Sequence, residues 1–548
     1  MGKFKSALLF SWMLLIGLQA MGQNRYAIHY KYKPQDFFTL EEPVLFLTSK
    51  ALERRDRQGI ALDSLDLPVS QKYIDQVSPF VKQVLYHSNW LNASIVIADQ
   101  ESIEEIKGFD FVDHVVLAAP GYVPEGKIST RVNGKSGINK NSKGKTNTLE
   151  APFDYQNSLL GIHEMHEEGF RGKGVTIAVF DAGFPGVDQI PGFSHLFENN
   201  QLLGTKDFVH VWNKNVYSKN QHGTNVLSLL ASDDPELLLS GAPEADYILC
   251  ITEEVSTEYR IEEYNWVKAA EFADSLGVDI INSSLGYWDF DDESMNYTFE
   301  DLDGESALVS KGASLAGNKG ILVVTSAGNY GNRGSSSITA PADSKGILSV
   351  GATNVSMERA SFSSQGPTFD GRIKPEVSTY GEQVWLLRSS GNLGRASGTS
   401  FSSPQIAALA AGLWQARPEW TKDELIGRIL ESSSLSALPD NSLGYGIPNF
   451  FRALYGEILS IDQKENEEVW KIFPNPLIGT DLFVRFGNQT ESEFYLIDIQ
   501  GKVLQRSNVR RASLQDPYYV PISVIPSGVY IVEMQAGSEV RRTKLIKR

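Results

Sequence analysis

Nearly continuous apolar runs recur in the middle of the chain, between residues 151 and 453. They lie at 175–180, 247–251, 278–281, 321–324 and 347–350. Strands that are buried on both faces have this composition, which is typical of parallel sheets. Polar and apolar positions between the runs follow a helical period, most clearly in 262–276, which Gly277 ends. The alternation predicts an α/β domain of three layers with a mostly parallel sheet over residues 151–453.

The N-terminal flank has a different pattern. Short apolar runs, for example at 26–30 and 94–98, alternate with charged segments throughout 23–120. This pattern predicts a small α+β unit. Residues 121–150 are rich in Gly, Ser, Asn, Thr and Lys and contain almost no apolar residues. This composition predicts a flexible, exposed linker that a protease can reach.

The C-terminal flank is predicted to be all β. Residues 454–468 form a polar, acidic bridge, and short alternating strands follow at 482–484, 494–499 and 528–533. Glycine-containing turns separate these strands. We therefore expect a small β-sandwich over residues 469–548.

The first 22 residues have the composition of a secretory signal peptide. Lys3 and Lys5 precede an apolar run at 7–18, and small residues at 20–22 suit cleavage after Gly22. A membrane anchor is the alternative, but the run is shorter than the roughly 20 residues that span a bilayer. No other stretch is apolar enough to cross a membrane, so we expect the mature protein to be secreted or to lie at the cell surface.

Composition narrows the function classes. Of the 548 residues 41% are hydrophobic and 21% are charged, as in ordinary globular proteins. The net charge of −17 argues against nucleic acid as a partner. The single cysteine, Cys250, excludes an intramolecular disulfide and a four-cysteine zinc site.

Three segments of the middle region carry groups with catalytic potential. Asp181 ends the apolar run 175–180, where α/β sheets place their ligands. His222 precedes a short helical run. Ser400 lies where a long helix is predicted to begin, with Pro404 in the first turn of that helix, and free N–H groups there stabilise an anion.

Each of these residues alone has an ordinary structural explanation, as a cap or a turn residue. Together, Asp181, His222 and Ser400 are the three groups of a hydrolytic triad, in which the serine attacks, the histidine removes its proton and the aspartate orients the imidazole. Asn329 ends the buried strand predicted for residues 323–329. Its carboxamide N–H is expected to bind the developing oxyanion beside the Ser400 N–H.

The four segments read AVFDAGF, HGTNV, TSAGN and GTSFSSP, and with them the chain resembles the subtilisin family of serine peptidases, the subtilases, over residues 151–453. The resemblance implies a subtilisin-like fold with catalytic Asp181, His222 and Ser400 and the oxyanion residue Asn329. It also implies that Ser284, Leu285 and Gly286 offer their backbone to an extended peptide substrate. Many subtilases have a second histidine where this chain has Asn225, a position outside the triad.

The flanks resemble known parts of such proteins. Residues 23–120 are similar to an inhibitory propeptide that assists folding. The motifs at 473–476, 496–502 and 526–530, together with the basic end 544–548, resemble a type A sorting domain of the type IX secretion system of Bacteroidetes. A generic β-sandwich that binds carbohydrate is the second interpretation.

Metal binding receives less support from the sequence. His163 and His166 have the spacing of two ligands on a helix, but no third ligand is near in the sequence, so they are interpreted as exposed helix residues. Subtilases often use calcium, and an acidic stretch at 289–303 offers carboxylates that suit such an ion, although a solvated loop is the preferred interpretation. The basic group Arg54, Arg55 and Arg57 is interpreted as a solvated face, with a site of intramolecular cleavage as the alternative.

These observations predict a secreted serine endopeptidase that hydrolyses peptide bonds through an acyl-enzyme. We expect it to be made as a preproprotein and to need no cofactor for chemistry. A structural calcium ion is compatible with this prediction. Its expected partners are protein or peptide substrates and the type IX secretion machinery. The alternative from another class is a catalytically inactive surface protein that uses the same scaffold for binding or adhesion.

Overall fold

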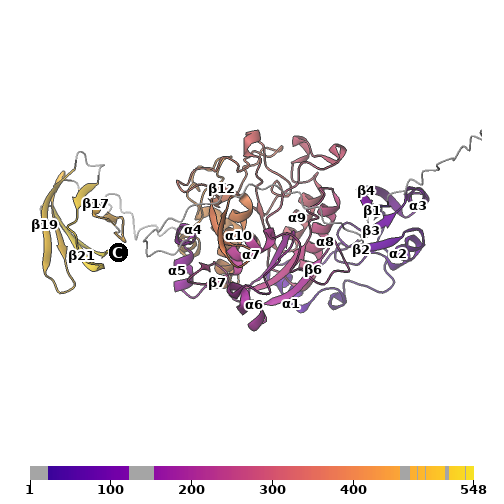
Figure 1. Ribbon diagram of the computed structural model, residues 1–548, viewed down its shortest axis with the longest axis horizontal. Helices are drawn as coiled ribbons and strands as arrows, with labels where there is room; N and C mark the ends of the chain where they lie inside the picture. Colours follow the sequence, from indigo (N-terminus) through magenta and orange to yellow (C-terminus); the bar gives the residue numbers. More distant parts are fainter. Residues whose placement is uncertain are drawn as a thin grey trace, which may run out of the picture. The chain divides into compact units, whose positions relative to one another are not determined.

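The computed structural model describes residues 23–122, 153–456, 470–477, 479–487, 489–511, 517–536 and 539–547. Contacts divide the chain into two compact units that separate after Glu457. The first unit contains the N-terminal α+β region and the central α/β region, and the second contains the C-terminal strands (Figure 1). No helix of the described ranges is long and apolar enough to cross a membrane. The predicted signal peptide and most of the predicted linker fall outside these ranges.

A seven-stranded sheet in which every neighbouring pair is parallel forms the centre of the first unit. In sheet order its strands are β13 (Val377–Tyr380), β12 (Leu348–Thr353), β11 (Leu322–Ser326), β10 (Ile280–Ser283), β5 (Thr176–Asp181), β9 (Asp246–Ile251) and β6 (Leu202–Asp207). The five apolar runs of the sequence are β5, β9, β10, β11 and β12. The edge strands β6 and β13 were not predicted, because their polar residues break the apolar pattern.

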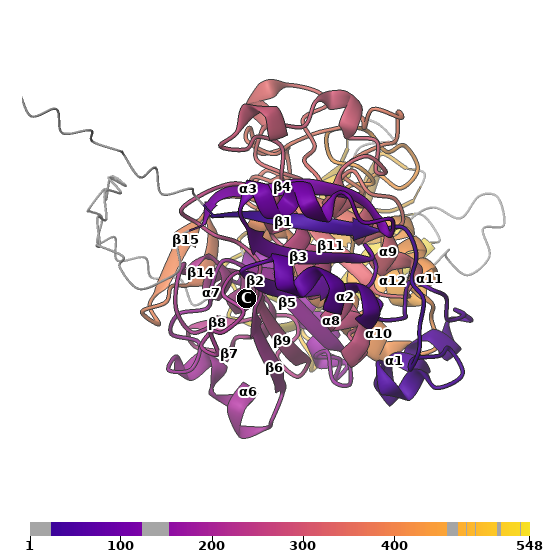
Figure 2. The same cartoon turned by 90° about the vertical axis from the view of Figure 1, so that its right-hand side faces the viewer.

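Both faces of this sheet are covered, so the sheet lies in the middle of three layers (Figures 1 and 2). Side chains alternate along β5: Ile177 and Val179 pack into one core and Ala178 and Phe180 into the other. The first core contains side chains of α7 (His222–Ala231) and α10 (Thr399–Ala416), and the second contains those of α8 (Ile261–Leu276) and α9 (Leu308–Asn318). This arrangement is the predicted three-layer α/β fold.

Smaller elements complete the central region. They are α4 (Asp154–Leu160), α5 (Ile162–Glu167), α6 (Ser194–Glu198), α11 (Lys422–Glu431), α12 (Phe450–Tyr455), the two-residue strands β7 (Asp233–Asp234) and β8 (Leu238–Leu239), the hairpin of β14 (Val384–Leu387) and β15 (Leu393–Ala396), and the 3₁₀ turns η3 (Pro191–Phe193), η4 (Glu293–Met295), η5 (Phe299–Asp301) and η6 (Gly331–Arg333). As predicted, α8 stops at Gly277, which has φ +81°, a conformation that glycine adopts without strain.

One detail of α10 differs from the prediction. The helix begins at Thr399, so Pro404 is its sixth residue and lies beyond the first turn. Proline has no N–H to donate to the carbonyl four residues earlier, which here belongs to Ser400. The Ser284 hydroxyl donates to that carbonyl instead, at 2.8 Å. The tertiary structure therefore supplies the hydrogen bond that proline removes from the helix.

The N-terminal region is an antiparallel sheet with helices on one side. Its strands run in the order β2 (Gln83–Ser88), β3 (Ala93–Ala98), β1 (Gln23–Tyr30) and β4 (Val112–Tyr122). Helices α2 (Gln71–Val77) and α3 (Gln100–Ile106) pack on one face, next to the turn η2 (Ser78–Phe80). The other face packs against Ile261 and Tyr264 of α8, which Figure 2 shows behind the strands. This region is the predicted α+β unit.

Helix α1 (Ser49–Arg57), which follows the turn η1 (Pro43–Leu45), leaves this sheet and anchors to the central region. Arg54 and Arg55 both pair with Asp274 of α8, and Arg54 also donates to the carbonyl of Val278 at 2.6 Å. The two arginine side chains are only 1% and 2% exposed. The interpretation of Arg54 and Arg55 as a solvated face was therefore wrong, because their partner lies about 220 residues later in the sequence.

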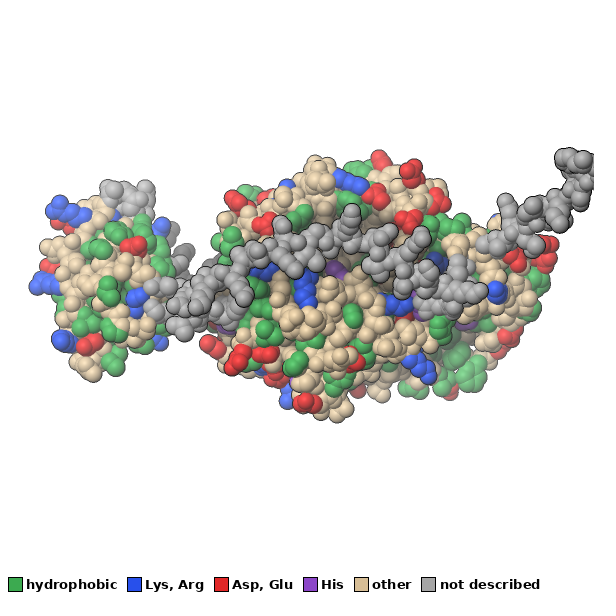
Figure 3. Space-filling model, viewed as in Figure 1, with side chains coloured by type: hydrophobic (Ala, Val, Ile, Leu, Met, Phe, Trp, Pro, Cys, Tyr) green, Lys and Arg blue, Asp and Glu red, His purple; other side chains and the backbone are tan. Residues whose placement is uncertain are grey.

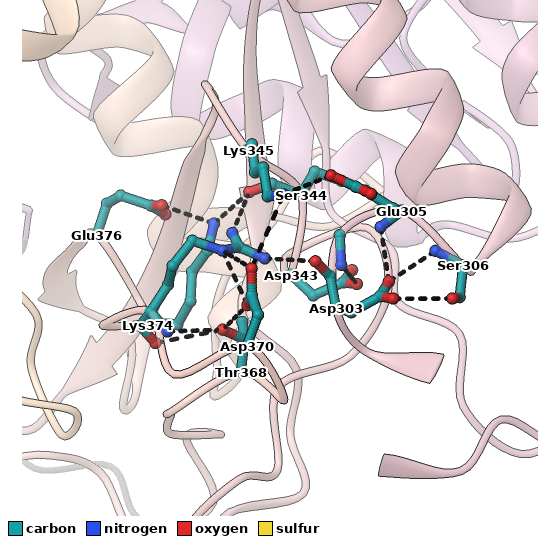
Figure 4. Close-up of polar contacts among 12 residues, drawn as sticks. Asp303, Glu305, Ser306, Asp343, Ser344, Lys345, Thr368, Asp370, Lys374 and Glu376 are labelled. Carbon is teal, nitrogen blue, oxygen red and sulfur yellow. Dashed lines mark hydrogen bonds and ion pairs between the residues drawn. The ribbon is translucent and has the colours of Figure 1, made fainter. Parts of the chain in front are cut away.

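A buried polar network braces the loops around the start of β12 and β13 (Figure 4). The Lys374 ammonium is fully buried, donates to the carbonyl of Ser344 at 2.7 Å and pairs with Glu376 at 2.6 Å. Burial lowers the pKa of Lys374, and Glu376 opposes that shift. The buried carboxylate of Asp343 accepts from the Gly304 amide at 2.8 Å. These contacts fix three loops to one another.

The second unit is a β-sandwich, as the sequence predicts. One sheet contains β16 (Lys471–Phe473), β17 (Asp481–Arg485) and β20 (Tyr518–Pro521), and the other contains β19 (Val503–Arg510), β18 (Glu491–Ile497), β21 (Gly528–Ala536) and β22 (Glu539–Lys547). Alternate residues of both sheets form one core, with Leu482, Val484, Phe494 and Val532 fully buried.

Candidate active site

Asp181 is the last residue of the central strand β5 and its side chain is fully buried. The chain builds the sheet to one side of β5 with β9 and β6, then crosses to the other side with β10. Ligands of open α/β sheets bind outside the carboxyl ends of the strands at such a switch point. Asp181 and Ser284, which directly follows β10, both lie at this edge.

His222 is the first residue of α7 and faces Asp181. The Nδ1 atom of His222 lies 2.9 Å from each carboxylate oxygen of Asp181. The next residue, Gly223, makes this approach possible, since a Cβ atom there would lie 2.9 Å from the Cβ of Asp181 and 2.8 Å from the Phe184 ring. The motif His-Gly therefore has a steric reason in this chain.

The electrostatics around His222 favour the charged imidazole. Burial lowers its pKa, but the charge of Asp181 and its hydrogen bond outweigh burial, and Glu253 adds a smaller effect in the same direction. The pKa of His222 is consequently raised above its usual value of 6.5. Because Asp181 occupies Nδ1, the outer nitrogen Nε2 is left to exchange protons with another group.

Ser400 is the second residue of α10 and 8% exposed. Its hydroxyl donates to the carbonyl oxygen of Ser284 at 3.2 Å, and among the described residues it has no hydrogen bond to His222. The His222 ring lies 5.6 Å from the ring of Phe401, the neighbour of Ser400, measured between centroids. The amide N–H of Ser400 belongs to the first helical turn, whose donors have no partner within the helix.

Asn329 follows β11 and is held by its carbonyl oxygen. Its Oδ1 atom accepts from the amide of Thr399 at 3.0 Å and from the hydroxyl of Thr399 at 3.1 Å. The side chain is otherwise exposed. With Oδ1 occupied, the Nδ2 donor is free for another acceptor next to the start of α10.

Ser284, Leu285 and Gly286 form an extended segment after β10. Leu285 accepts at its carbonyl from Ser326, at 3.1 Å, and Gly286 is exposed. A side chain at position 286 would collide with Thr339, so the segment needs glycine there. Within the described ranges the backbone N–H and C=O groups of Gly286 make no hydrogen bond, and an added strand can use such free groups.

Comparison with known sequences decides the family. Residues 172–446, half of the chain, match the Subtilase family of peptidases. The chain belongs to the subtilase family. It is therefore a serine-type endopeptidase by family, and the subtilase fold spans the central sheet and its helices.

Curated relatives agree with this assignment. The subtilase chain is 27% identical to subtilisin E of Bacillus subtilis over 381 residues, which are 69% of this chain and 84% of the relative. It is 26% identical to the thermostable alkaline protease of Halalkalibacterium halodurans, over 56% of this chain and 74% of the relative.

Solved structures are also similar. A structure of MycP1 from the ESX-1 type VII secretion system is 20% identical and has a TM-score of 0.46, covering 57% of this chain and 88% of that one. The prenylagaramide maturation protease PagA is 20% identical with a TM-score of 0.43, over 54% of this chain and 97% of that one.

The flanks of the subtilase also match known families. Residues 25–132 match the peptidase S8 propeptide domain of Bacteroidota, and residues 471–548 match the secretion system C-terminal sorting domain. The sorting domain is of the type IX kind, and it places the subtilase outside the cell or at the cell surface. The protein is thus a zymogen with a propeptide, a peptidase domain and a sorting domain.

The structure also places the residues that the sequence analysis considered for metal binding. In the acidic stretch 289–303, Asp291, Glu293 and Glu300 are exposed, and Figure 3 shows acidic side chains along the upper edge of the first unit. His166 is half-buried, and its Nε2 atom lies 2.9 Å from the carbonyl oxygen of Gly241, so it is not the exposed residue that we expected. Burial lowers its pKa to about 4.

The sequence pattern missed two features of the site. The first is Thr399, whose hydroxyl contacts Asn329 and orients it. Its position directly before Ser400 was a sequence signal for a role in the site. Glu253, Glu258 and Glu262 converge at the end of β9 and the start of α8. The four-residue spacing of the last two was visible in the sequence, but their meeting with Glu253 depends on the turn between the elements.

Proposed function

We propose that this subtilase hydrolyses internal peptide bonds of proteins with Ser400 as nucleophile, His222 as base and Asp181 as the residue that orients the base. The observation that carries the proposal is the pair of 2.9 Å contacts between His222 Nδ1 and Asp181, at the carboxyl edge of the sheet and beside the start of α10. A carboxylate on Nδ1 fixes the tautomer in which Nε2 accepts a proton.

The first half of the reaction forms an acyl-enzyme. The Ser400 hydroxyl turns from the Ser284 carbonyl towards His222 Nε2, gives up its proton and attacks the substrate carbonyl. The oxyanion of the tetrahedral intermediate accepts from the Ser400 N–H and from Nδ2 of Asn329. The imidazolium then protonates the leaving amine, and the peptide bond breaks.

The second half returns the enzyme to its starting state. Water takes the place of the amine, His222 removes one of its protons, and the hydroxide attacks the acyl carbon. The intermediate collapses, the new carboxyl group leaves, and His222 returns the proton to Ser400. All proton transfers use side chains of this chain, so we propose that the chemistry needs no cofactor.

The substrate is proposed to bind as an extended strand. The segment Ser284, Leu285 and Gly286 follows the strand β10 and offers the free backbone groups of Gly286. Main-chain hydrogen bonds hold any sequence, so they suit an endopeptidase whose selectivity depends on side-chain pockets. The C-terminal β-sandwich is proposed to bind the type IX secretion machinery.

A serine-directed fluorophosphonate probe tests the assignment. We expect the processed protein to be labelled at Ser400, and Ser400→Ala to lose both labelling and peptide hydrolysis, by about 10⁶-fold in kcat. Ser361→Ala is the matched control, because Ser361 is exposed and lies outside the site. A processed, folded protein that is not labelled would instead support the inactive binding protein.

A further inference from the structure

Three glutamates from different positions of the chain converge beside the substrate segment. Glu253 lies two residues after β9, Glu258 lies in the following loop, and Glu262 lies in the first turn of α8. One carboxylate oxygen from each lies within 4.8 Å of the other two. Across the ranges that the structure describes, this is the one group of three or more such side chains close enough to hold a metal ion together.

The three carboxylates have no positive partner in the part of the chain that the structure describes. None of the salt bridges there involves Glu253, Glu258 or Glu262; the nearby Arg25 pairs with Glu254 instead, at 2.7 Å. Negative charges that are close together and shielded from water repel one another strongly unless a cation compensates them.

Glu262 gives an independent sign of a missing ligand. Its side chain is 1% exposed, and Oε1 accepts from the amide of Glu254 at 2.6 Å. The other oxygen, Oε2, is buried and receives no hydrogen bond from an amide, hydroxyl or cationic group among the described residues; the Glu258 carboxyl is the group within hydrogen-bonding reach of the Glu262 side chain. A buried acceptor without a partner costs free energy, so a structure normally supplies one.

We propose that Glu253, Glu258 and Glu262 bind one calcium ion. Calcium takes oxygen ligands at 2.3–2.6 Å, so ligands on opposite sides of the ion are about 4.6–5.2 Å apart. The three oxygens lie within 4.8 Å of one another, close enough to share one such ion. Calcium commonly takes several protein carboxylates, whereas magnesium usually takes one or two and keeps several waters. Magnesium holds its ligands at 2.0–2.1 Å, about 4.2 Å across, and zinc prefers the nitrogen and sulfur ligands that this group lacks.

The position of the site indicates what the ion does. Glu253 accepts a hydrogen bond from the hydroxyl of Tyr287 at 2.6 Å, and Tyr287 directly follows Gly286. Tyr287 also pairs its backbone with Ala340 on the far side of the segment. A bound ion would therefore fix the loop after β9 and, through Tyr287, one end of the segment that is proposed to bind substrate. Only this consequence depends on the proposed peptidase function.

Calcium binding is measured on the full chain with Ser400→Ala, which cannot digest itself. After treatment with EDTA and removal of the chelator, calorimetric titration with CaCl₂ at pH 8 gives stoichiometry and Kd, and thermal unfolding gives Tm. We expect Tm to rise by roughly 3 °C at a free calcium concentration 100 times the Kd, given the size of the first unit. We expect Glu262→Gln and Glu258→Gln each to lower the stoichiometry by one ion and to remove that rise.

The matched control is Glu300→Gln, which removes one charge from an exposed position outside the cluster. It should keep both the stoichiometry and the rise in Tm. In EDTA, Glu262→Gln should unfold at the same temperature as the parent or higher, because it relieves repulsion, and this result separates a lost ion from a damaged fold.

Three results would overturn the proposal. The first is a parent chain that binds no calcium at millimolar concentration. The second is unchanged calcium stoichiometry and affinity in both glutamine variants, or magnesium binding as tightly as calcium. The third is a cluster that ignores calcium but binds an arginine-containing peptide in a manner that requires Glu262, which would make it a pocket for a basic side chain.

Discussion

Asn329 is fixed on one side by Thr399, which leaves its Nδ2 donor for an oxyanion. We predict that Asn329→Ala lowers kcat by about 10²–10³-fold with little change in KM, because the hydrogen bond strengthens mainly in the transition state. Steady-state kinetics on a chromogenic peptide measure both constants. A change in KM alone would mean that Asn329 shapes only the ground-state pocket.

Thr399→Val provides the companion measurement. It keeps the shape of Thr399 but removes the hydroxyl, which contacts Asn329 Oδ1 at 3.1 Å and also the backbone N–H and carbonyl of Gly328. We expect kcat to fall by about tenfold or less, the value of one hydrogen bond, since the Thr399 amide still holds the oxygen. In the double variant with Asn329→Ala this extra loss should disappear, as expected for residues that act as a pair.

The charge of Asp181 determines the pH dependence of the site. Activity needs a neutral His222, and the pKa of His222 is raised above 6.5 because Asp181 outweighs burial. We therefore predict that kcat/KM falls as the pH drops through this raised pKa. Asp181→Asn should move the acid limb to lower pH and reduce kcat by about 10⁴-fold. A kcat/KM that stays flat from pH 5 to 8 would exclude His222 as the base.

Among the elements, helix α1 has the most specific role, since it docks the propeptide onto α8. Arg54 is 1% exposed and pairs with Asp274, whereas Arg57 is 36% exposed and lies 3.4 Å from Asp279. We predict that Arg54→Ala lowers the free energy of unfolding of the Ser400→Ala precursor by about 3–5 kcal/mol, because it breaks a buried ion pair.

The matched variant is Arg57→Ala, for which we expect a loss of at most about 1 kcal/mol, as for exposed pairs. Denaturant unfolding of the first unit, followed by tryptophan fluorescence, measures both. Equal losses for the two variants would show that α1 is held by packing alone, independently of the charge on Asp274.

At the scale of the whole molecule, we predict that maturation removes both flanks. The active form should begin within or just after residues 121–150 and lack roughly the last 80 residues. The linker is polar and glycine-rich, and the second unit has its own core, so both cuts leave the central sheet intact. N-terminal sequencing and intact mass of the secreted protein measure both ends.

The anchoring of α1 adds an expectation about the order of events. Cleavage in the linker leaves the ion pairs of Arg54 and Arg55 with Asp274 in place, so the cut propeptide should stay bound until it is degraded. A fully active species that begins at Gln23 and ends at Arg548 would contradict both halves of the processing prediction.

Local sequence determined the elements and the candidate residues. The apolar runs specify strands such as β5 and β9 because a strand that is buried on both faces needs apolar side chains at every position. Gly277 specifies the end of α8 because few other residues adopt a positive φ there. The motifs around Asp181, His222, Asn329 and Ser400 were likewise visible in the sequence, because each consists of consecutive residues.

Tertiary structure alone decided which distant residues meet. Arg54 and Arg55 are buried against Asp274, and the Ser284 hydroxyl donates to the carbonyl that Pro404 leaves without a helical partner. Both contacts join segments that no local period relates. The charge and hydrogen-bonding capacity of a residue follow from the sequence, but the packing of the folded chain determines which residue becomes its partner. The energetic cost of burying an unpaired polar group then makes these long-range contacts specific.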